Sequence, residues 1–206
     1  GKKYFISFID EHCRKSWTFL LKEKSEATNV IIYFLKYLSN HFNNSSVKYF
    51  KSDNAKEYKN KKVQKFCKQN GIVKIFSPPY NPQNNGIAER FNQTIINCAK
   101  TILFTAKLNT KFWDFALNYA TLLYNLTPHS SIQNNIPNEL FYSKRVNLSK
   151  IRVFGCIAFH NNLQDKSSKF EKNSDQGIFL GIDAPSNSYI IMNCKSHKIV
   201  LTREAI

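Results

Sequence analysis

Residues 77–89 decide the fold and read Ser-Pro-Pro-Tyr-Asn-Pro-Gln-Asn-Asn-Gly-Ile-Ala-Glu. Three prolines stiffen this stretch, and Asn84-Asn85-Gly86 permits positive φ. A simple turn would not need such length. Helical periodicity begins directly after it, so we expect a lid-like loop that delivers Glu89 onto the first turn of a long helix.

Asp53 is the expected partner of Glu89, 36 positions upstream, where it follows the short apolar strand predicted over residues 47–50. Two carboxylates suit a pair of Mg²⁺ (or Mn²⁺) ions held about 4 Å apart for phosphoryl transfer. Two ordinary roles compete with this interpretation. Asp53 can cap the helix that follows it, and Glu89 can complement the dipole of its own helix. The spacing alone is weak, because chance supplies acidic pairs at any fixed separation.

The charge balance favours a polyanionic partner. The chain contains 30 Lys and Arg residues and 14 Asp and Glu residues, which gives a net charge of +16. Nucleic acid is the leading candidate for the partner. A solvated basic surface is the alternative. Six lysines cluster near Asp53 and either contact phosphate or aid solubility: Lys56, Lys59, Lys61, Lys62, Lys65 and Lys68.

The helix after Glu89 is expected to run to about Ala106 and to bury Ile87, Phe91, Ile95, Cys98 and Ile102. Glu89 lies about 200° from Ile87 around the helix, so it points away from the core with Gln93 and Lys100. We expect five residues of this loop and helix to bind DNA, although a solvated polar face is the commoner reading for the helix: Tyr80, Asn85, Asn92, Gln93 and Lys100.

The five cysteines form no Cys-x-x-Cys pair, and the histidines are scattered. We expect reduced, mostly buried cysteines and no structural zinc site. No apolar run approaches a membrane span, so no membrane partner is expected. The chain begins at Gly1 and its one methionine is Met192, so we expect a piece of a longer protein.

Periodicity divides the chain into two domains, residues 1–145 and 146–206. The first alternates strands with helices: strands over 4–9, 17–21, 47–50 and 72–76, and helices from about 25 to 42, through the lysine-rich segment that ends at Gly71, and from Phe112 to before Pro128. The second contains short β-like runs separated by turn formers, over 151–154, 157–159, 177–180, 189–191 and 198–201. These patterns predict a mixed α/β domain followed by a small antiparallel barrel, with residues 130–137 as a connecting loop.

The chain resembles the integrase of copia-type LTR retrotransposons, within the retroviral integrase superfamily. The resemblance lies in several long motifs in the right order: 4–10 with Arg14 and Trp17, 51–54 with Glu57-Tyr58, 86–92, Phe112-Trp113, 153–156 and 177–181. It implies an RNase H-like mixed sheet flanked by helices and then an SH3-like barrel.

By this resemblance, Asp53 and Glu89 match the second and third acids of a catalytic triad that binds two Mg²⁺ ions and joins DNA 3′-hydroxyls to target DNA. The first acid of the family lies on a strand that precedes the strand beginning here at Tyr4, so we expect that strand and acid to be absent. Asp10 matches the acidic turn after the second strand and is not expected to bind metal. The resemblance further implies homo-oligomers, DNA as partner and action in the nucleus.

Three functions remain open. The leading hypothesis is a DNA strand transferase fragment, inactive by itself because an acid is missing. The second is a transposon-derived relic that binds DNA without catalysis. The third is a related nuclease in which water attacks instead of a DNA hydroxyl.

Overall fold

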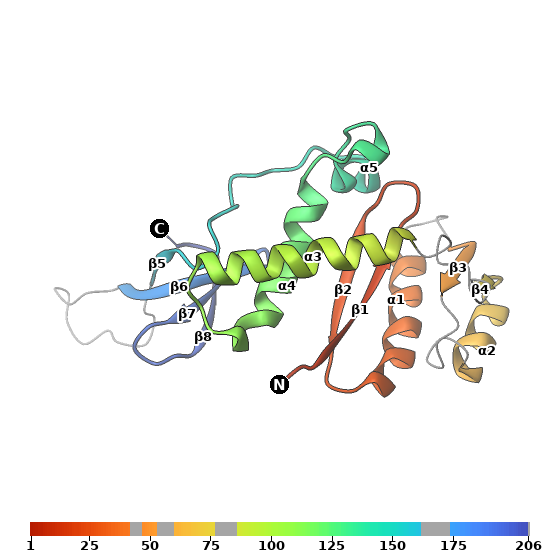
Figure 1. Ribbon diagram of the computed structural model, residues 1–206, viewed down its shortest axis with the longest axis horizontal. Helices are drawn as coiled ribbons and strands as arrows, with labels where there is room; N and C mark the ends of the chain where they lie inside the picture. Colours follow the sequence, from red (N-terminus) through yellow and green to blue (C-terminus); the bar gives the residue numbers. More distant parts are fainter. Residues whose placement is uncertain (42–46, 53–59, 77–85, 162–173, 206) are drawn as a thin grey trace. The chain divides into compact units, whose positions relative to one another are not determined.

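The computed structural model describes residues 1–41, 47–52, 60–76, 86–161 and 174–205. They form two compact units, which are described separately below. The first unit comprises Gly1–Glu11 and Trp17–Asn92, and the second comprises His12–Ser16 and Gln93–Ile206. Figure 1 labels the helices and strands along the chain.

The first unit contains strands and helices in alternation, as predicted. Its elements are β1 (Tyr4–Ile9), β2 (Ser16–Leu21), the short 3₁₀ helix η1 (Lys24–Glu26), α1 (Ala27–His41), β3 (Tyr49–Ser52), α2 (Lys61–Gln69) and β4 (Val73–Phe76). In the described part of the chain, β1 pairs with β2 and β3 pairs with β4, in two separate two-stranded sheets.

The core of this unit forms around α1, which Figure 1 shows beside the β1–β2 hairpin. Ile31, Phe34 and Leu35 are buried with helical spacing, as the sequence predicts. The ring of Phe34 stacks on Phe8 of β1 with centroids 4.2 Å apart. Phe50 of β3 joins the same cluster, so both sheets are anchored in one core.

The third strand begins two residues later than predicted. β3 spans Tyr49–Ser52 and buries Phe50 and Ser52 on one face, because its parallel register with β4 starts at Tyr49↔Val73. α2 agrees with the prediction in burying Val63 and Cys67. Gly71 follows its last turn with a φ of +66°, the left-handed conformation that glycine adopts without strain.

The second unit holds most of α3 (Gly86–Thr105) and everything after it. The elements that follow are η3 (Thr110–Phe112), α4 (Trp113–Leu126), η4 (Ser130–Ile132), α5 (Pro137–Tyr142), β5 (Ile157–Asn161), β6 (Ser174–Asp183), β7 (Ser188–Asn193) and β8 (Ile199–Thr202). Residues 130–137 were predicted to be a connecting loop, but they contain η4, and α5 starts at Pro137 because proline is favourable at the first helical position.

The buried stripe of α3 differs from the predicted one. Phe91, Ile95, Ala99 and Leu103 are buried, at every fourth position. Ile87 is 38% exposed, and Cys98 and Ile102 are half-buried. The buried stripe therefore includes the small Ala99 and Leu103 in place of Cys98 and Ile102.

On α4, the buried face is made largely by Ala116, Leu117, Tyr119 and Ala120. Phe112 of η3 and the α4 residues Phe115, Leu122 and Leu123 are half-buried.

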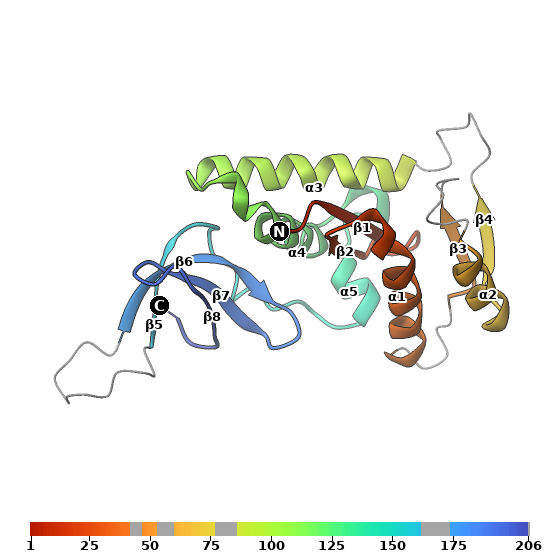
Figure 2. The same cartoon turned by 90° about the horizontal axis from the view of Figure 1, so that it is seen from below.

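Strands β5 to β8 form a four-stranded antiparallel sheet in chain order. Figure 2 labels the four strands. A bulge between Phe179 and Gly181 bends β6. An isolated bridge between His160 and Ala205 brings the chain after β8 back to β5. This closure fits the predicted small barrel.

The prediction of a strand over residues 151–154 is wrong. Both backbone polar groups of Arg152 bond the Tyr119 hydroxyl of α4: the carbonyl accepts its proton at 2.5 Å, and the N–H donates to its oxygen at 3.2 Å. Phe154 is buried with its ring 5.9 Å from that of Tyr119. The segment is therefore held by α4 and has no strand partner among the described residues.

None of the five cysteines forms a disulfide, but they are not mostly in the core. Cys13 and Cys67 are buried, Cys98 and Cys156 are half-buried, and Cys194 is exposed. None of the helices in the described ranges combines the length and the apolar character needed to cross a membrane.

Candidate functional site

The register of the parallel pair β3–β4 places two predicted site segments at one sheet edge. Ser52 and Phe76 are the last residues of their strands, and they are direct partners across the ladder. Because the strands are parallel, the chain leaves both at the same edge. Asp53 follows Ser52, and the proline-rich stretch follows Phe76. Both lie outside the described residues, as do Tyr80 and Asn85.

Glu89 lies on the first turn of α3, as predicted, and its side chain is exposed. It has no hydrogen bond or ion pair with another described residue. A carboxylate at this position is stabilised by the positive end of the helix dipole. The residue is therefore available to a ligand, and the dipole role remains open beside it.

The alternative role of Asp53 as cap of the following helix is taken by another residue. Asn60 is the N-cap of α2, and its side-chain oxygen accepts the N–H of Lys62 at 2.9 Å. Such a cap satisfies one of the helix's free donors. Asp53 is not required at the start of α2.

The two carboxylates are suitable ligands for Mg²⁺, which prefers hard oxygen donors. Within the described ranges, no group of three or more His, Cys, Asp or Glu side chains could hold a metal ion. Glu89 is thus the single described contributor to the predicted metal site.

Of the three predicted DNA-binding residues on α3, Gln93 and Lys100 are exposed. Asn92 is half-buried, and its side-chain oxygen accepts the hydroxyl of Ser7 on β1 at 2.8 Å. This bond fixes the start of α3 to the hairpin, so Asn92 has a structural role whether or not it also contacts DNA.

The outer face of α2 is strongly basic. Lys61, Lys62, Lys65 and Lys68 are all exposed, and no acid occurs from Lys61 to Phe76. Lys74 of β4 stands over the ring of Phe76 at 4.5 Å, and burial lowers the pKa of its amine. Like charges gathered without acids favour contact with a polyanion.

The sequence did not reveal a buried cation in the second unit. Lys15 is 8% exposed, and its ammonium donates to Asn138 Oδ1 at 2.5 Å and lies 5.3 Å from the centre of the Tyr142 ring. Burial lowers its pKa from 10.5 to about 8. No pattern near position 15 signals this, because α5 supplies both contacts from more than 120 residues away.

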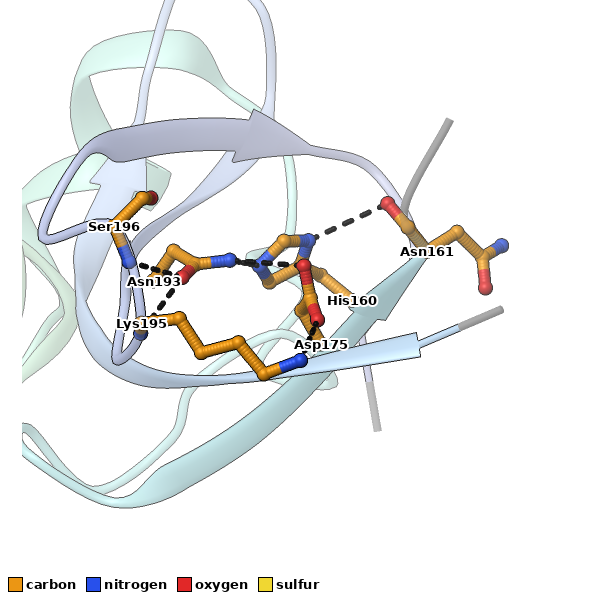
Figure 3. A network of polar contacts seen from close by, with 6 residues as sticks. All are labelled: His160, Asn161, Asp175, Asn193, Lys195 and Ser196. Carbon is orange, nitrogen blue, oxygen red and sulfur yellow. Dashed lines mark hydrogen bonds and ion pairs between the residues drawn. The ribbon is translucent and has the colours of Figure 1, made fainter. Parts of the chain in front are cut away.

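A second missed feature is the polar network of β5, β6 and β7 in Figure 3. Asn193 donates to Asp175 at 3.2 Å and lies 3.4 Å from His160 Nε2. Lys195 donates to the other oxygen of Asp175 at 3.1 Å. The hydrogen bond from Lys195 is the main cause that lowers the pKa of Asp175. The network ties three strands together next to the β7–β8 turn.

Family comparisons agree with both halves of the chain. The family "Integrase core domain" matches residues 1–82, and the family "Retroviral polymerase SH3-like domain" matches residues 156–206. The predicted boundary between residues 145 and 146 falls between these matches and stays a prediction.

Two curated plant proteins match almost the whole chain. The retrovirus-related Pol polyprotein from transposon TNT 1-94 of Nicotiana tabacum is 32% identical over 100% of the chain. The corresponding polyprotein from transposon RE1 of Arabidopsis thaliana is 28% identical over 98%. The chain spans only 15% and 14% of the lengths of these relatives.

Solved structures show the same fold. The catalytic core domain of BIV integrase aligns with 68% of this chain and 85% of its own, with a TM-score of 0.50 at 20% identity. The simian T-cell lymphotropic virus intasome structure, solved with PP2A regulatory subunit B56 gamma, aligns with 98% of this chain and 70% of its own, with a TM-score of 0.54 at 16% identity. The predicted RNase H-like fold is confirmed. The chain belongs to the integrase family of retrovirus-related, copia-type transposon Pol polyproteins.

Proposed function

We propose that this chain is part of an enzyme that joins the 3′ ends of transposon DNA to target DNA. The observation that carries the proposal is the Ser52↔Phe76 register. Because of this register, the segment that begins at Asp53 and the segment of residues 77–85 both start at the same edge of the sheet. Helix α3, which carries Glu89, begins directly after residue 85. The family membership supplies the reaction class.

Asp53 and Glu89 are the proposed ligands of two Mg²⁺ (or Mn²⁺) ions. The ions would supply Lewis-acid stabilisation of charge on the reacting phosphate. In the joining step, a DNA 3′-hydroxyl oxygen forms a new bond to a target phosphorus. The bond from that phosphorus to its original 3′ oxygen breaks, the attacking hydroxyl loses its proton to solvent, and the leaving 3′ oxygen takes up a proton from solvent. The basic face of α2 contacts the DNA backbone, and Gln93 and Lys100 of α3 are further proposed DNA contacts.

A two-carboxylate site holds a metal pair less well than a site with three. We propose that the third carboxylate comes from a strand upstream of Gly1 in the parent protein, so this piece by itself binds DNA without joining it. The parent enzyme acts as a homo-oligomer on two DNA ends in the nucleus. A DNA-binding relic without catalysis is the second candidate, and the +16 charge is its support.

The test measures Mg²⁺- or Mn²⁺-dependent joining of a labelled oligonucleotide to plasmid DNA, together with DNA binding in the same samples. Glu89→Gln is compared with the unaltered chain and with Glu204→Gln, which removes an exposed acid elsewhere. Joining that is lost only in Glu89→Gln establishes the transferase and shows that the piece already holds enough ligands.

If all three proteins bind DNA without joining it, the same assay is repeated with a longer piece of the parent protein that includes the upstream segment. Joining by that longer piece, abolished by Glu89→Gln, supports the transferase and the missing third ligand. A longer piece that binds DNA and still joins none refutes the transferase and favours the relic. Cleavage without joining identifies the nuclease.

A further inference from the structure

A pocket in the second unit lies between α3, α4 and the segment of residues 151–154. It is lined by Ile102 of α3, by Tyr119 and Leu123 of α4, and by residues 151–154. It encloses about 460 Å³, and ligand pockets range from about 300 to 1,000 Å³. Apart from the tyrosine hydroxyl and the guanidinium of Arg152, its side chains are apolar. This pocket, called the α3–α4 pocket below, therefore has room for an organic group and suits an apolar one.

Close contacts hold the walls of this pocket in place. The hydroxyl of Tyr119 bonds both backbone polar groups of Arg152, and the N–H of Gly155 donates to the carbonyl of Phe179 at 2.8 Å. Gly155 has a φ of +82°, and a Cβ added to it would come within 2.4 Å of the Cβ of Ala106, directly after α3. The segment of residues 151–155 is therefore fixed against both helices. A pocket whose walls are already in place loses little entropy when a ligand binds.

Part of the apolar lining is in contact with water. Val153 is 73% exposed, and Ile102 and Ile151 are half-buried. The polar groups of the pocket bond within the chain, since Nη1 of Arg152 donates to the carbonyls of Ser149 and Ile151. The pocket therefore offers water few hydrogen-bond partners among the described groups. Displacing such water by an apolar group increases affinity.

The part of the chain that forms this pocket is mainly basic. From Arg90 to Asn161 it contains eight Lys and Arg residues and two acids, Asp114 and Glu139. None of the lining residues is acidic, and Arg152 is both a lining residue and exposed. The other basic residues of this stretch are Arg90, Lys100, Lys107, Lys111, Lys144, Arg145 and Lys150. A surface of this composition attracts negative charge.

The acids of the neighbouring elements bond elsewhere. Three acids of the second unit each accept a backbone N–H from a residue close in the chain: Asp114 from Phe115, Glu139 from Val146 and Asp183 from Ser186. Asp175 accepts from Asn193 and Lys195. Glu89 lies 13 positions before Ile102, which is about 20 Å along α3. Arg152 is therefore the charged group at the pocket itself.

An apolar pocket beside a cation is complementary to an apolar side chain flanked by carboxylates. A second copy of the chain suits it poorly, because both copies carry a net charge of +16. Duplex DNA supplies negative charge, but its bases stay stacked and leave the pocket unfilled. We propose that the α3–α4 pocket docks an acidic segment of a partner protein, in which one Leu, Ile, Phe or Trp side chain enters the pocket and neighbouring Asp or Glu residues face Arg152. This inference goes beyond the proposed DNA joining and does not depend on it.

The test begins with the selection of short random peptides, displayed on phage, against the full chain. Recovered peptides should combine Asp or Glu with a large apolar residue a few positions away. One recovered peptide is then labelled with fluorescein and titrated by anisotropy. Replacing its apolar residue with serine should weaken binding about tenfold, because a buried anchor carries most of the affinity of such a contact. Replacing one of its acids with the amide should weaken binding about threefold.

Variants of the chain then locate the contact. Val153→Asp puts an acid on a lining residue whose side chain is mostly exposed, and it should weaken peptide binding about tenfold. Leu201→Asp is the matched control, because Leu201 is 55% exposed on β8, does not line the pocket and undergoes the same charge change. It should keep the affinity within about twofold, since salt screens charges away from the contact. Arg152→Gln should weaken binding about threefold, and Arg203→Gln, at an exposed position after β8, should not.

Recovery of no peptide above background would overturn the inference. Recovered peptides that are acidic without an apolar residue, or equal peptide affinities of Val153→Asp and Leu201→Asp, would show that only the general basic charge attracts them, and would also overturn it. Affinity for a plain DNA duplex, measured on the same samples, should be equal in these two variants. A DNA affinity lowered only in Val153→Asp would assign the pocket to nucleic acid, and a dimer lost only in Val153→Asp would assign it to a second copy; either result refutes the acidic partner.

Discussion

Replacing Lys15 with methionine should stabilise the protein at neutral pH. Lys15 is an ammonium ion held among α5 residues with 8% of its surface exposed. Its ammonium donates to Asn138 Oδ1 and lies 5.3 Å from the centre of the Tyr142 ring. Moving a charged group out of water costs free energy, and the lowered pKa of Lys15 indicates that this cost outweighs the contacts that the ammonium makes. Methionine keeps a similar unbranched length without the charge.

The pKa of Lys15 gives the size of this cost. Burial lowers it from 10.5 to about 8, and each unit corresponds to about 1.4 kcal/mol, so the charged form costs the fold about 3 kcal/mol. Removing the donor also leaves Asn138 without this bond, a loss of about 1 kcal/mol. Lys15→Met should therefore raise the free energy of unfolding by about 2 kcal/mol at pH 7.

The pH dependence has a definite sign. Between about pH 8 and 10.5, the unfolded chain holds the Lys15 proton and the folded chain does not. Because the unfolded state binds more protons there, the contribution of Lys15 to stability rises with pH across this window. The advantage of Lys15→Met should be full below pH 8 and should shrink as the pH approaches 10.5.

Urea unfolding of the unaltered chain and of Lys15→Met at pH 7 and at pH 10 measures the difference between their free energies of unfolding. The titration of all other groups cancels in this difference. Lys36→Met serves as the control, because Lys36 is exposed on α1. A Lys15→Met protein that is less stable at pH 7, or whose advantage does not change with pH, would refute the reasoning that burial of the charge dominates.

Two further predictions concern the second unit. Tyr119→Phe removes the hydroxyl that bonds both backbone groups of Arg152 and should lower the free energy of unfolding by about 2 kcal/mol in urea titration; no change would show that packing of the ring alone holds the segment. Asp175→Ala should lower the thermal midpoint at pH 7. Because the pKa of Asp175 is lowered, mainly by Lys195, its stabilisation is present above about pH 4 and is lost as the pH falls through the lowered pKa. The two midpoints should therefore converge as the pH falls through the lowered pKa, and a constant gap would contradict this.

Much of the first unit was predictable from local patterns. The hairpin β1–β2, helix α1 and helix α2 each follow from periodicity and turn residues within one short segment. Such patterns fail where distant segments decide the contact. The buried face of α3 contains Ala99 and Leu103 instead of Cys98 and Ile102, and residues 151–154 are held by a hydroxyl on α4, 33 positions away.

The candidate site was likewise predictable from the sequence only in part. The sequence placed Glu89 on the first turn of a helix, because the end of a proline-rich stretch and the start of helical periodicity are both local signals. It did not show that Asn92 is bound to Ser7 or that Asn60 caps α2. Those roles depend on which polar groups meet after folding.

The sequence by itself determined the alternation of strands and helices, the basic character of the chain and the position of Glu89, because these depend on residue types and on short-range geometry. Only the tertiary structure decided that the chain leaves β3 and β4 at one edge and that Lys15 is buried. These features arise from packing between residues that are far apart in the chain, and no local pattern encodes the partner that a side chain meets there.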